Sequence, residues 1–109
     1  MGSLAILVVA FNRPDLLRQT LTEVERYNPR RLYFASDGPR AHVAGDRALV
    51  NEVREVFASF DWQGPLSTNL AEQNLGLRQS MVRALDWFFQ NEPEGVILED
   101  DCVPSADFF

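Results

Sequence analysis

The chain has 109 residues, of which 46% are hydrophobic and 24% charged, and its formal net charge is −6. This size and composition predict one globular domain, residues 1–109, with a single hydrophobic core. The negative charge argues against nucleic-acid binding, which needs a basic surface to neutralise phosphates. All basic residues are arginines. Walker-type phosphate loops and pyridoxal-phosphate Schiff bases both need a lysine, so these two sites are excluded.

Cysteine content and hydropathy bear on location. The single cysteine, Cys102, cannot form an internal disulfide, so nothing in the chain indicates an oxidising compartment. The first apolar run, residues 4–11, is too short to span a bilayer and has no basic segment before it. We therefore expect a cytoplasmic location and no membrane contact from this segment.

The first half of the chain contains two strand–helix pairs. Residues 4–11 form a continuous apolar run, which is typical of a parallel strand covered on both faces. Residues 12–15 end that strand, and Pro14 suits the first position of a helix. A second strand over residues 32–35 ends in turn-forming residues 36–39. The apolar stripes of the two helices are Leu17, Leu21 and Val24, then Leu49, Val53, Val56, Phe57 and Phe60.

The second half repeats the alternation. Residues 64–70 predict a third strand, more polar and therefore at a sheet edge, and residues 95–98 predict a fourth. The helix between them follows residues 74–76, and its stripe is Leu77, Met81, Leu85 and Phe88. The resulting β-α-β-α-β-α-β order predicts an α/β fold, a Rossmann-like three-layer α/β/α sandwich around a mainly parallel four-stranded sheet.

Three carboxylates, Glu99, Asp100 and Asp101, follow the fourth apolar run directly. Two unit charges about 4 Å apart repel by about 4 kcal/mol at an effective dielectric near 20, so the cluster calls for a counter-ion. Carboxylate oxygens suit hard divalent cations, and Mg²⁺ usually completes its shell with substrate phosphates. The triplet therefore predicts a Mn²⁺ or Mg²⁺ site.

Other polar residues fall at the same edge of the predicted sheet, beyond the carboxyl ends of the strands, where open α/β sheets bind ligands. A helix start and two arginines suit a diphosphate, and an aspartate at a strand end can accept hydrogen bonds from a base or ribose. The sequence thus predicts a cleft for a nucleotide diphosphate bridged by a metal. Its residues are Phe11, Asn12, Arg13, Asp37, Gly38, Asn74, Gly76, Arg78, Glu99 and Asp100.

Several segments resemble the nucleotide-binding half of GT-A type glycosyltransferases. Residues 6–14 are similar to the start of these enzymes, residues 34–38 to the end of their second strand, and residues 73–78 to the segment near the donor diphosphate. Glu99-Asp100-Asp101 resembles their Asp-x-Asp metal motif. Together with Pro104 and residues 107–109, it is most similar to N-acetylglucosaminyltransferases that carry a Glu-Asp-Asp variant.

The resemblance implies a nucleotide-sugar donor, with UDP as the nucleotide, and a saccharide or other hydroxyl acceptor. It assigns metal coordination to Asp101, ribose or sugar hydroxyls to Asp100 and the sugar to Glu99. It assigns the uracil ring to Asp37, and the nucleotide or its phosphates to Arg13 and Arg78. The acceptor half and the catalytic base are expected beyond Phe109, so this fragment alone is expected to be inactive. Its uncovered sheet edge predicts self-association.

Other interpretations remain open from the residues alone. The triplet could be a solvated acidic loop, or a Ca²⁺ or partner site in a non-catalytic α/β domain. Asp37 could have only a structural role, because Asp-Gly is a common turn sequence. A sugar-phosphate nucleotidyltransferase would need a glycine-rich signature and a lysine after the first strand, and both are missing. A dinucleotide-binding domain is disfavoured because residues 12–16 contain no Gly-x-Gly-x-x-Gly motif.

Overall fold

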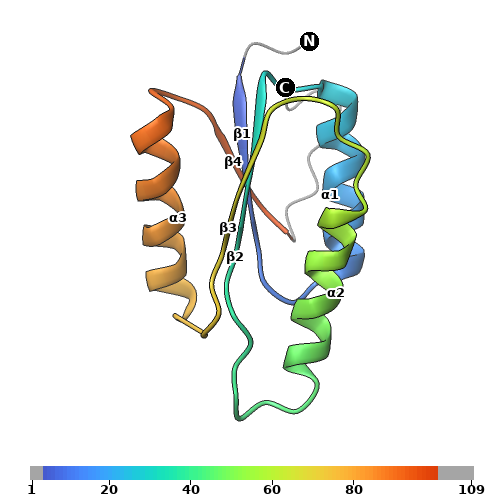
Figure 1. The fold of residues 1–109 in the computed structure, drawn as a ribbon, viewed down its shortest axis with the longest axis vertical. Helices are drawn as coiled ribbons and strands as arrows, with labels where there is room; N and C mark the ends of the chain where they lie inside the picture. Colours follow the sequence, from blue (N-terminus) through green and yellow to red (C-terminus); the bar gives the residue numbers. More distant parts are fainter. Residues whose placement is uncertain (1–3, 101–109) are drawn as a thin grey trace.

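A computed structural model describes residues 4–100 of the chain, in which strands and helices alternate as the sequence predicts (Figure 1). The acidic residue Asp101 and the aromatic pair at 108–109 lie outside the described residues. The elements are β1 (Ala5–Ala10), α1 (Pro14–Tyr27), β2 (Arg31–Ser36), α2 (Asp46–Ala58), β3 (Leu66–Leu70), α3 (Leu77–Asn91) and β4 (Val96–Glu99).

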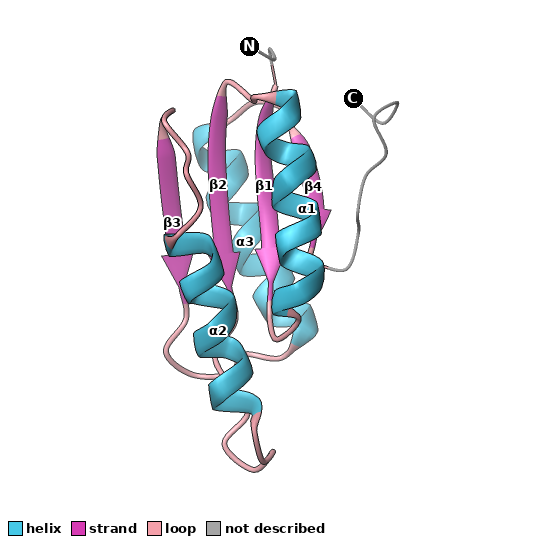
Figure 2. Cartoon of the chain, turned by 90° about the vertical axis from the view of Figure 1, so that its right-hand side faces the viewer, coloured by secondary structure: helices cyan, strands magenta, loops and turns pink. Residues whose placement is uncertain are grey.

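The four strands form one sheet in the order β3-β2-β1-β4, and every pair is parallel. Helices α1 and α2 cover one face and α3 covers the other, so the α/β prediction and its three layers are confirmed (Figures 1 and 2). Since all strands run the same way, their carboxyl ends meet at one edge of the sheet. The segments after β1, β2 and β4 therefore lie together.

Strand β1 is the centre of the core, and all of its residues are buried, as a continuous apolar run predicts. Alternate side chains point to opposite faces. Ile6 and Val8 pack with α1 and α2, whereas Leu7 and Val9 pack with α3. On the first face the rings of Phe34 and Phe57 stack with their centroids 3.9 Å apart.

Two helical stripes differ from the sequence prediction. Leu77 is 81% exposed, and α3 buries Ala84 and Phe88 instead. Its first turn extends past the end of the sheet, where there is no strand to pack on, because β2 and β1 have already ended. In α2, Val50 is buried in the position predicted for Leu49, which is 41% exposed. The helix ends at Ala58, so Phe60 lies beyond it.

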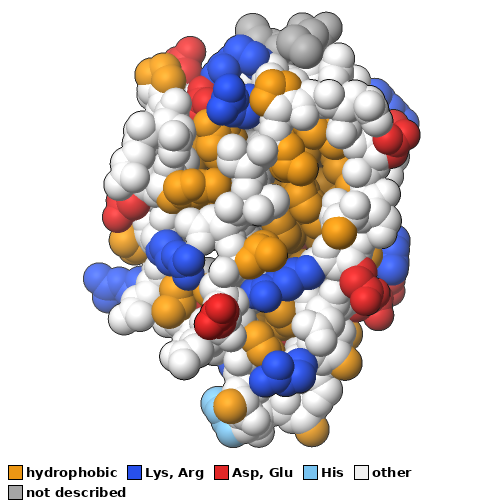
Figure 3. Space-filling view, viewed as in Figure 1, with side chains coloured by type: hydrophobic (Ala, Val, Ile, Leu, Met, Phe, Trp, Pro, Cys, Tyr) orange, Lys and Arg blue, Asp and Glu red, His pale blue; other side chains and the backbone are white. Residues whose placement is uncertain are grey.

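Strand β3 lies at a sheet edge, as its polar composition predicts. Leu66 and Leu70 of this strand remain 46% and 43% exposed. Figure 3 views the molecule from this edge and shows hydrophobic side chains interspersed with arginines at the surface. Among residues 4–100, no helix has both the length and the apolar composition to cross a bilayer.

Candidate functional site

A cleft of about 450 Å³ opens at the carboxyl ends of β1, β2 and β4, beside the start of α3. Its walls come from four separate parts of the chain, which the parallel topology brings to one edge. It collects most of the residues predicted from the sequence. Those that line it are Phe11, Asn12, Arg13, Asp37, Asn74, Gly76, Glu99 and Asp100.

Asp37 is buried at the end of β2 and ties that strand end to the segment before α3. Its Oδ1 accepts hydrogen bonds from the backbone N–H groups of Gly38 (2.8 Å) and Leu75 (2.9 Å). Its Oδ2 accepts one from the side-chain amide of Asn74 at 3.1 Å. A carboxylate offers about four acceptor positions, so one remains on Oδ2 for a ligand N–H group.

Gly38 completes this corner without lining the cleft. Its carbonyl accepts a second hydrogen bond from Asn74 Nδ2, at 3.0 Å. A Cβ atom at Gly38 would lie 2.6 Å from the backbone carbonyl carbon of Gln73. Glycine is therefore required here for the close approach of two backbone segments, and its contribution to the cleft is indirect.

Arg54 of α2 supports the same corner from behind. Its Nη2 donates to the carbonyl oxygens of Asp37 (3.2 Å) and Ala71 (2.6 Å), and its Nε donates to the Ser36 hydroxyl (3.1 Å). Burial lowers the pKa of Arg54, while the charge of Asp37 acts in the opposite direction. Sequence reasoning missed this arginine because its partners are two backbone oxygens and a serine hydroxyl, and such contacts leave no signature in the sequence.

The two acidic residues at the end of β4, Glu99 and Asp100, have different roles. Glu99 is exposed at the end of β4 and lines the cleft. Asp100 is buried, and its Oδ2 accepts a hydrogen bond from the backbone N–H of Phe11 at 2.9 Å. Its own N–H donates to the Val9 carbonyl at 2.9 Å. Asp100 therefore fastens β4 to the end of β1 as well as facing the cleft.

The opposite wall is the start of α3. Gly76 stands before the first helical residue with φ 85° and ψ 159°, a conformation that is essentially restricted to glycine. Gly76, the N-cap residue, has no side chain that could cap the helix, and the first backbone N–H groups of a helix have no partner within it. Together with the positive end of the helix dipole and the nearby Arg13, they suit an anion such as a phosphate.

Arg78 is not brought into the cleft. It lies one residue into α3 and lines a separate, shallow hollow on that helix, together with Arg83 and Trp87. Successive residues of a helix point about 100° apart, so Leu77 and Ser80 line the cleft while Arg78 lies on another side. The sequence prediction for Arg78 is therefore not supported by the geometry.

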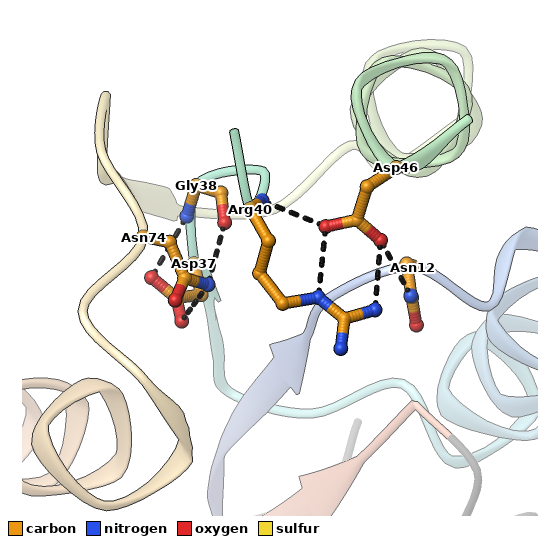
Figure 4. Close-up of polar contacts among 6 residues, drawn as sticks. All are labelled: Asn12, Asp37, Gly38, Arg40, Asp46 and Asn74. Atoms are coloured by element: carbon orange, nitrogen blue, oxygen red, sulfur yellow. Dashed lines mark hydrogen bonds and ion pairs between the residues drawn. The ribbon is translucent and has the colours of Figure 1, made fainter. Parts of the chain in front are cut away.

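The sequence analysis missed one charged cleft residue, Arg40, and the residue that holds it, Asp46. Arg40, in the loop after β2, lines the cleft and is held by Asp46, the first residue of α2 (Figure 4). Arg40 Nε and Nη2 donate to the two oxygens of Asp46 at 3.2 and 3.1 Å, and the Arg40 backbone N–H adds a third bond at 2.7 Å. Asn12 Nδ2 supplies a fourth, at 3.0 Å.

The hydrogen bonds from the Arg40 guanidinium hold the pKa of Asp46 far below its usual range, although burial acts in the opposite direction. Asp46 is therefore ionised at all ordinary pH values, and Arg40 keeps its partner. An aspartate at a helix start is ordinarily interpreted as favourable to the helix dipole. Nothing in the sequence spacing indicated that this one turns toward Asn12 and Arg40.

The chemistry of the site combines hydrogen-bond donors, carboxylates and an uncapped helix start. Glu99 and Asp100 offer the hard oxygen ligands that Mg²⁺ and Mn²⁺ prefer. Within residues 4–100, no group of three or more potential ligands is close enough to hold a metal by itself.

A comparison with known proteins gives no match to a family model, a curated protein or a solved structure.

Proposed function

We propose that the cleft binds the nucleotide part of a nucleotide-sugar, with UDP as the nucleotide, in a metal-dependent glycosyltransferase. One observation carries the proposal: a single cleft at the carboxyl ends of the strands joins an uncapped helix start to two carboxylates at a third strand end. The first feature suits a diphosphate, and the second suits the cation that would bridge it. The sequence resemblance to GT-A enzymes also points to four residues of this cleft, Arg13, Asp37, Glu99 and Asp100.

Each part of a nucleotide diphosphate has a matching group in the cleft. Asp37 retains an acceptor position for a ring N–H group, as noted above. The start of α3 at Gly76, with Arg13, offers donors and positive charge for phosphates. Glu99 and Asp100 suit the cation and the sugar hydroxyls at the other end, and Asp101, to which the resemblance assigns the metal, lies outside the described residues.

The carboxylates fit a divalent cation in donor type, since both offer hard oxygens at the edge of the cleft. A bound Mn²⁺ or Mg²⁺ supplies positive charge that stabilises a departing diphosphate. In the proposed reaction, an acceptor hydroxyl would attack the anomeric carbon of the sugar while the bond to the diphosphate breaks. The hydroxyl proton would pass to a base, and we assign that role to no residue among 4–100.

The proposal is tested by calorimetric titration of the chain with UDP, with and without Mn²⁺. We expect binding that needs the metal and that Asp101→Ala abolishes. Asp86→Ala is a matched control because Asp86 is exposed on α3 at the separate hollow. UDP binding that is equal with and without metal, or that Asp101→Ala leaves unchanged, would contradict the proposal.

Titration with Ca²⁺ and with Mg²⁺, added to the UDP titration, tests the alternative of a non-catalytic domain. It is favoured by the structural use of two carboxylates, since Asp37 and Asp100 both accept hydrogen bonds from the backbone. If the domain is non-catalytic, Ca²⁺ and Mg²⁺ should bind equally and no nucleotide should bind. If it binds a donor, UDP should bind with Mn²⁺ present.

A further inference from the structure

The Arg40 side chain is fixed before any ligand arrives. Its guanidinium makes a two-pronged contact with Asp46, and the guanidinium carbon lies 5.3 Å from the centroid of the Phe11 ring. Asp46 is only 1% exposed and accepts a hydrogen bond from Asn12, so the position of the Arg40–Asp46 pair is fixed. Donors that are already ordered lose little conformational entropy on binding a ligand.

Arg40 nevertheless keeps free hydrogen-bonding capacity. Its contacts with Asp46 use Nε, Nη2 and the backbone N–H. Within residues 4–100, Nη1 hydrogen-bonds to no protein group, and the side chain is 40% exposed where it lines the cleft. Guanidinium nitrogens are donors only, so Nη1 can bind only an acceptor atom of a ligand.

Charge and position separate this donor from the phosphate end of the cleft. Asp46 offsets the charge of Arg40 at 3.1 Å, so the pair adds donors to the cleft but little net positive charge. Figure 4 shows Arg40 extending between Asp46 and the Asp37–Asn74 contact, at the ends of β1 and β2. The uncapped start of α3, which suits phosphate, belongs to the other wall.

We propose that Arg40 is a specificity-determining residue that donates from Nη1 to an oxygen of the nucleobase, and that Asp46 is its positioning residue. A base placed there meets an acceptor on Asp37 and a donor on Arg40, and the Phe11 ring also lines the cleft. Aromatic rings stack on planar ligands. The inference rests on the proposed function, because it assigns one more contact in the same cleft.

The test compares the unaltered chain with the Arg40→Gln/Asp46→Asn double variant, each with Mn²⁺ and each titrated with UDP, ADP and inorganic pyrophosphate. Changing both residues avoids a buried carboxylate without a partner, and a thermal melt verifies the fold. We expect the affinity for UDP to fall about tenfold, as for a lost hydrogen bond to a charged group. The affinities for ADP, whose base has no carbonyl oxygen, and for pyrophosphate should stay within about twofold, since neither loses such a bond.

Two further variants sharpen the result. Arg40→Lys keeps the charge but loses the planar fork, so it should weaken UDP binding about as much as the double variant does. Arg47→Gln is the matched control, because Arg47 is the next residue of α2, is exposed and does not line the cleft. It should bind UDP as the unaltered chain does.

The possible outcomes separate this inference from the proposed function. If the unaltered chain binds no nucleotide, the proposed function fails and the inference fails with it. If the unaltered chain binds UDP but the double variant binds it equally well, only the inference is overturned. Equal losses for UDP and pyrophosphate would mean that Arg40 contacts phosphate, and full UDP binding by Arg40→Lys would mean that charge alone matters; either result overturns the assignment to the base.

Discussion

Single buried carboxylates hold this fold together at both ends of the sheet. At the carboxyl ends, Asp37, Asp46 and Asp100 each fasten segments that are far apart in the sequence. At the opposite end Glu92, which follows α3, accepts hydrogen bonds from Tyr33 Oη at 2.6 Å and from Arg30. Burial of an ionised group costs free energy unless such partners compensate it. Because folding lowers the pKa values of Asp46 and Glu92, their contacts make stability depend on pH in the acid range.

Glu92 allows this dependence to be tested away from the cleft. Burial acts to raise its pKa, but the hydrogen bonds from Tyr33 and Arg30 outweigh burial and bring the pKa below its usual value. A carboxyl whose pKa is lowered by folding contributes stability above its unfolded pKa, and this is lost as pH falls through the folded value. We expect Glu92→Gln to unfold about 2 kcal/mol more easily at pH 7, since it loses hydrogen bonds to a charged group.

Urea denaturation at pH 7 and at pH 3 provides the measurement. The difference between Glu92→Gln and the unaltered chain should shrink at pH 3, because this pH lies below the unfolded pKa of a glutamate and the unfolded chain then takes up the proton. The exposed neighbour Glu94 gives the control variant Glu94→Gln, which should leave stability unchanged at both values. A Glu92→Gln deficit of the same size at pH 3 would show that the carboxylate charge is not what stabilises this end.

The two ends of helix α3 have different roles: one packs on the sheet and the other lines the cleft. Its middle and last turns bury Ala84 and Phe88 against the sheet. Phe88 makes edge-to-face contacts with Tyr33 and Phe89, with ring centroids 4.9 and 5.1 Å apart. Its first turn stands beyond the sheet and forms a wall of the cleft, with Leu77 largely exposed. Packing energy is therefore concentrated away from the ligand-facing end.

This division predicts opposite effects for two apolar side chains of one helix. Phe88→Ala should destabilise the chain by about 3–5 kcal/mol, because it leaves a cavity between α3 and the sheet. Leu77→Ser should change the free energy of unfolding by less than about 0.5 kcal/mol, as is usual for exposed positions. Chemical denaturation of the two variants is the measurement. A Leu77→Ser loss above about 1 kcal/mol would contradict this description of the first turn, since exposed positions rarely cost so much.

The same helix shows which structural features could be predicted from the sequence and which could not. Strand and helix order followed from apolar runs and periodicity, because burial on a parallel sheet demands them. Leu77 was wrongly assigned to the buried stripe, because periodicity gives the phase of a helix but not where the sheet beneath it ends. The aspartate at 37, the asparagine at 74 and the acidic strand end were found because strand ends must meet at one edge. Arg40 and Asp46 were not, since their contact depends on the path of an irregular loop.

Helices cover both faces of the sheet, but its two edges are open. Among residues 4–100, β3 and β4 each pair with a neighbour on one side only. Unpaired strand edges offer backbone donors and acceptors to another chain, and natural proteins usually protect them with charge, proline or covering segments. Strand β3 has no charged residue, and Leu66 and Leu70 are about half exposed beside its edge. The hydrophobic side chains of Figure 3 lie on this side.

We therefore expect the chain to self-associate at high concentration, and we expect β3 to contribute. Sedimentation equilibrium should show an average mass that rises with protein concentration. The double variant Leu66→Lys/Leu70→Lys should lower that mass toward the monomer, because charges along an edge repel a second copy and remain easily hydrated. Both side chains are already partly in water, so the fold should tolerate the change.

Leu49→Lys is the matched control, since it adds a lysine at an apolar position of α2 that is 41% exposed and does not line the hollow beside β3. It should leave the average mass unchanged. If the double variant associates as strongly as the unaltered chain, the contact lies elsewhere, and the edge of β4 becomes the next to test. If the unaltered chain is monomeric at millimolar concentration, the two open edges are insufficient for association, and the expectation is wrong.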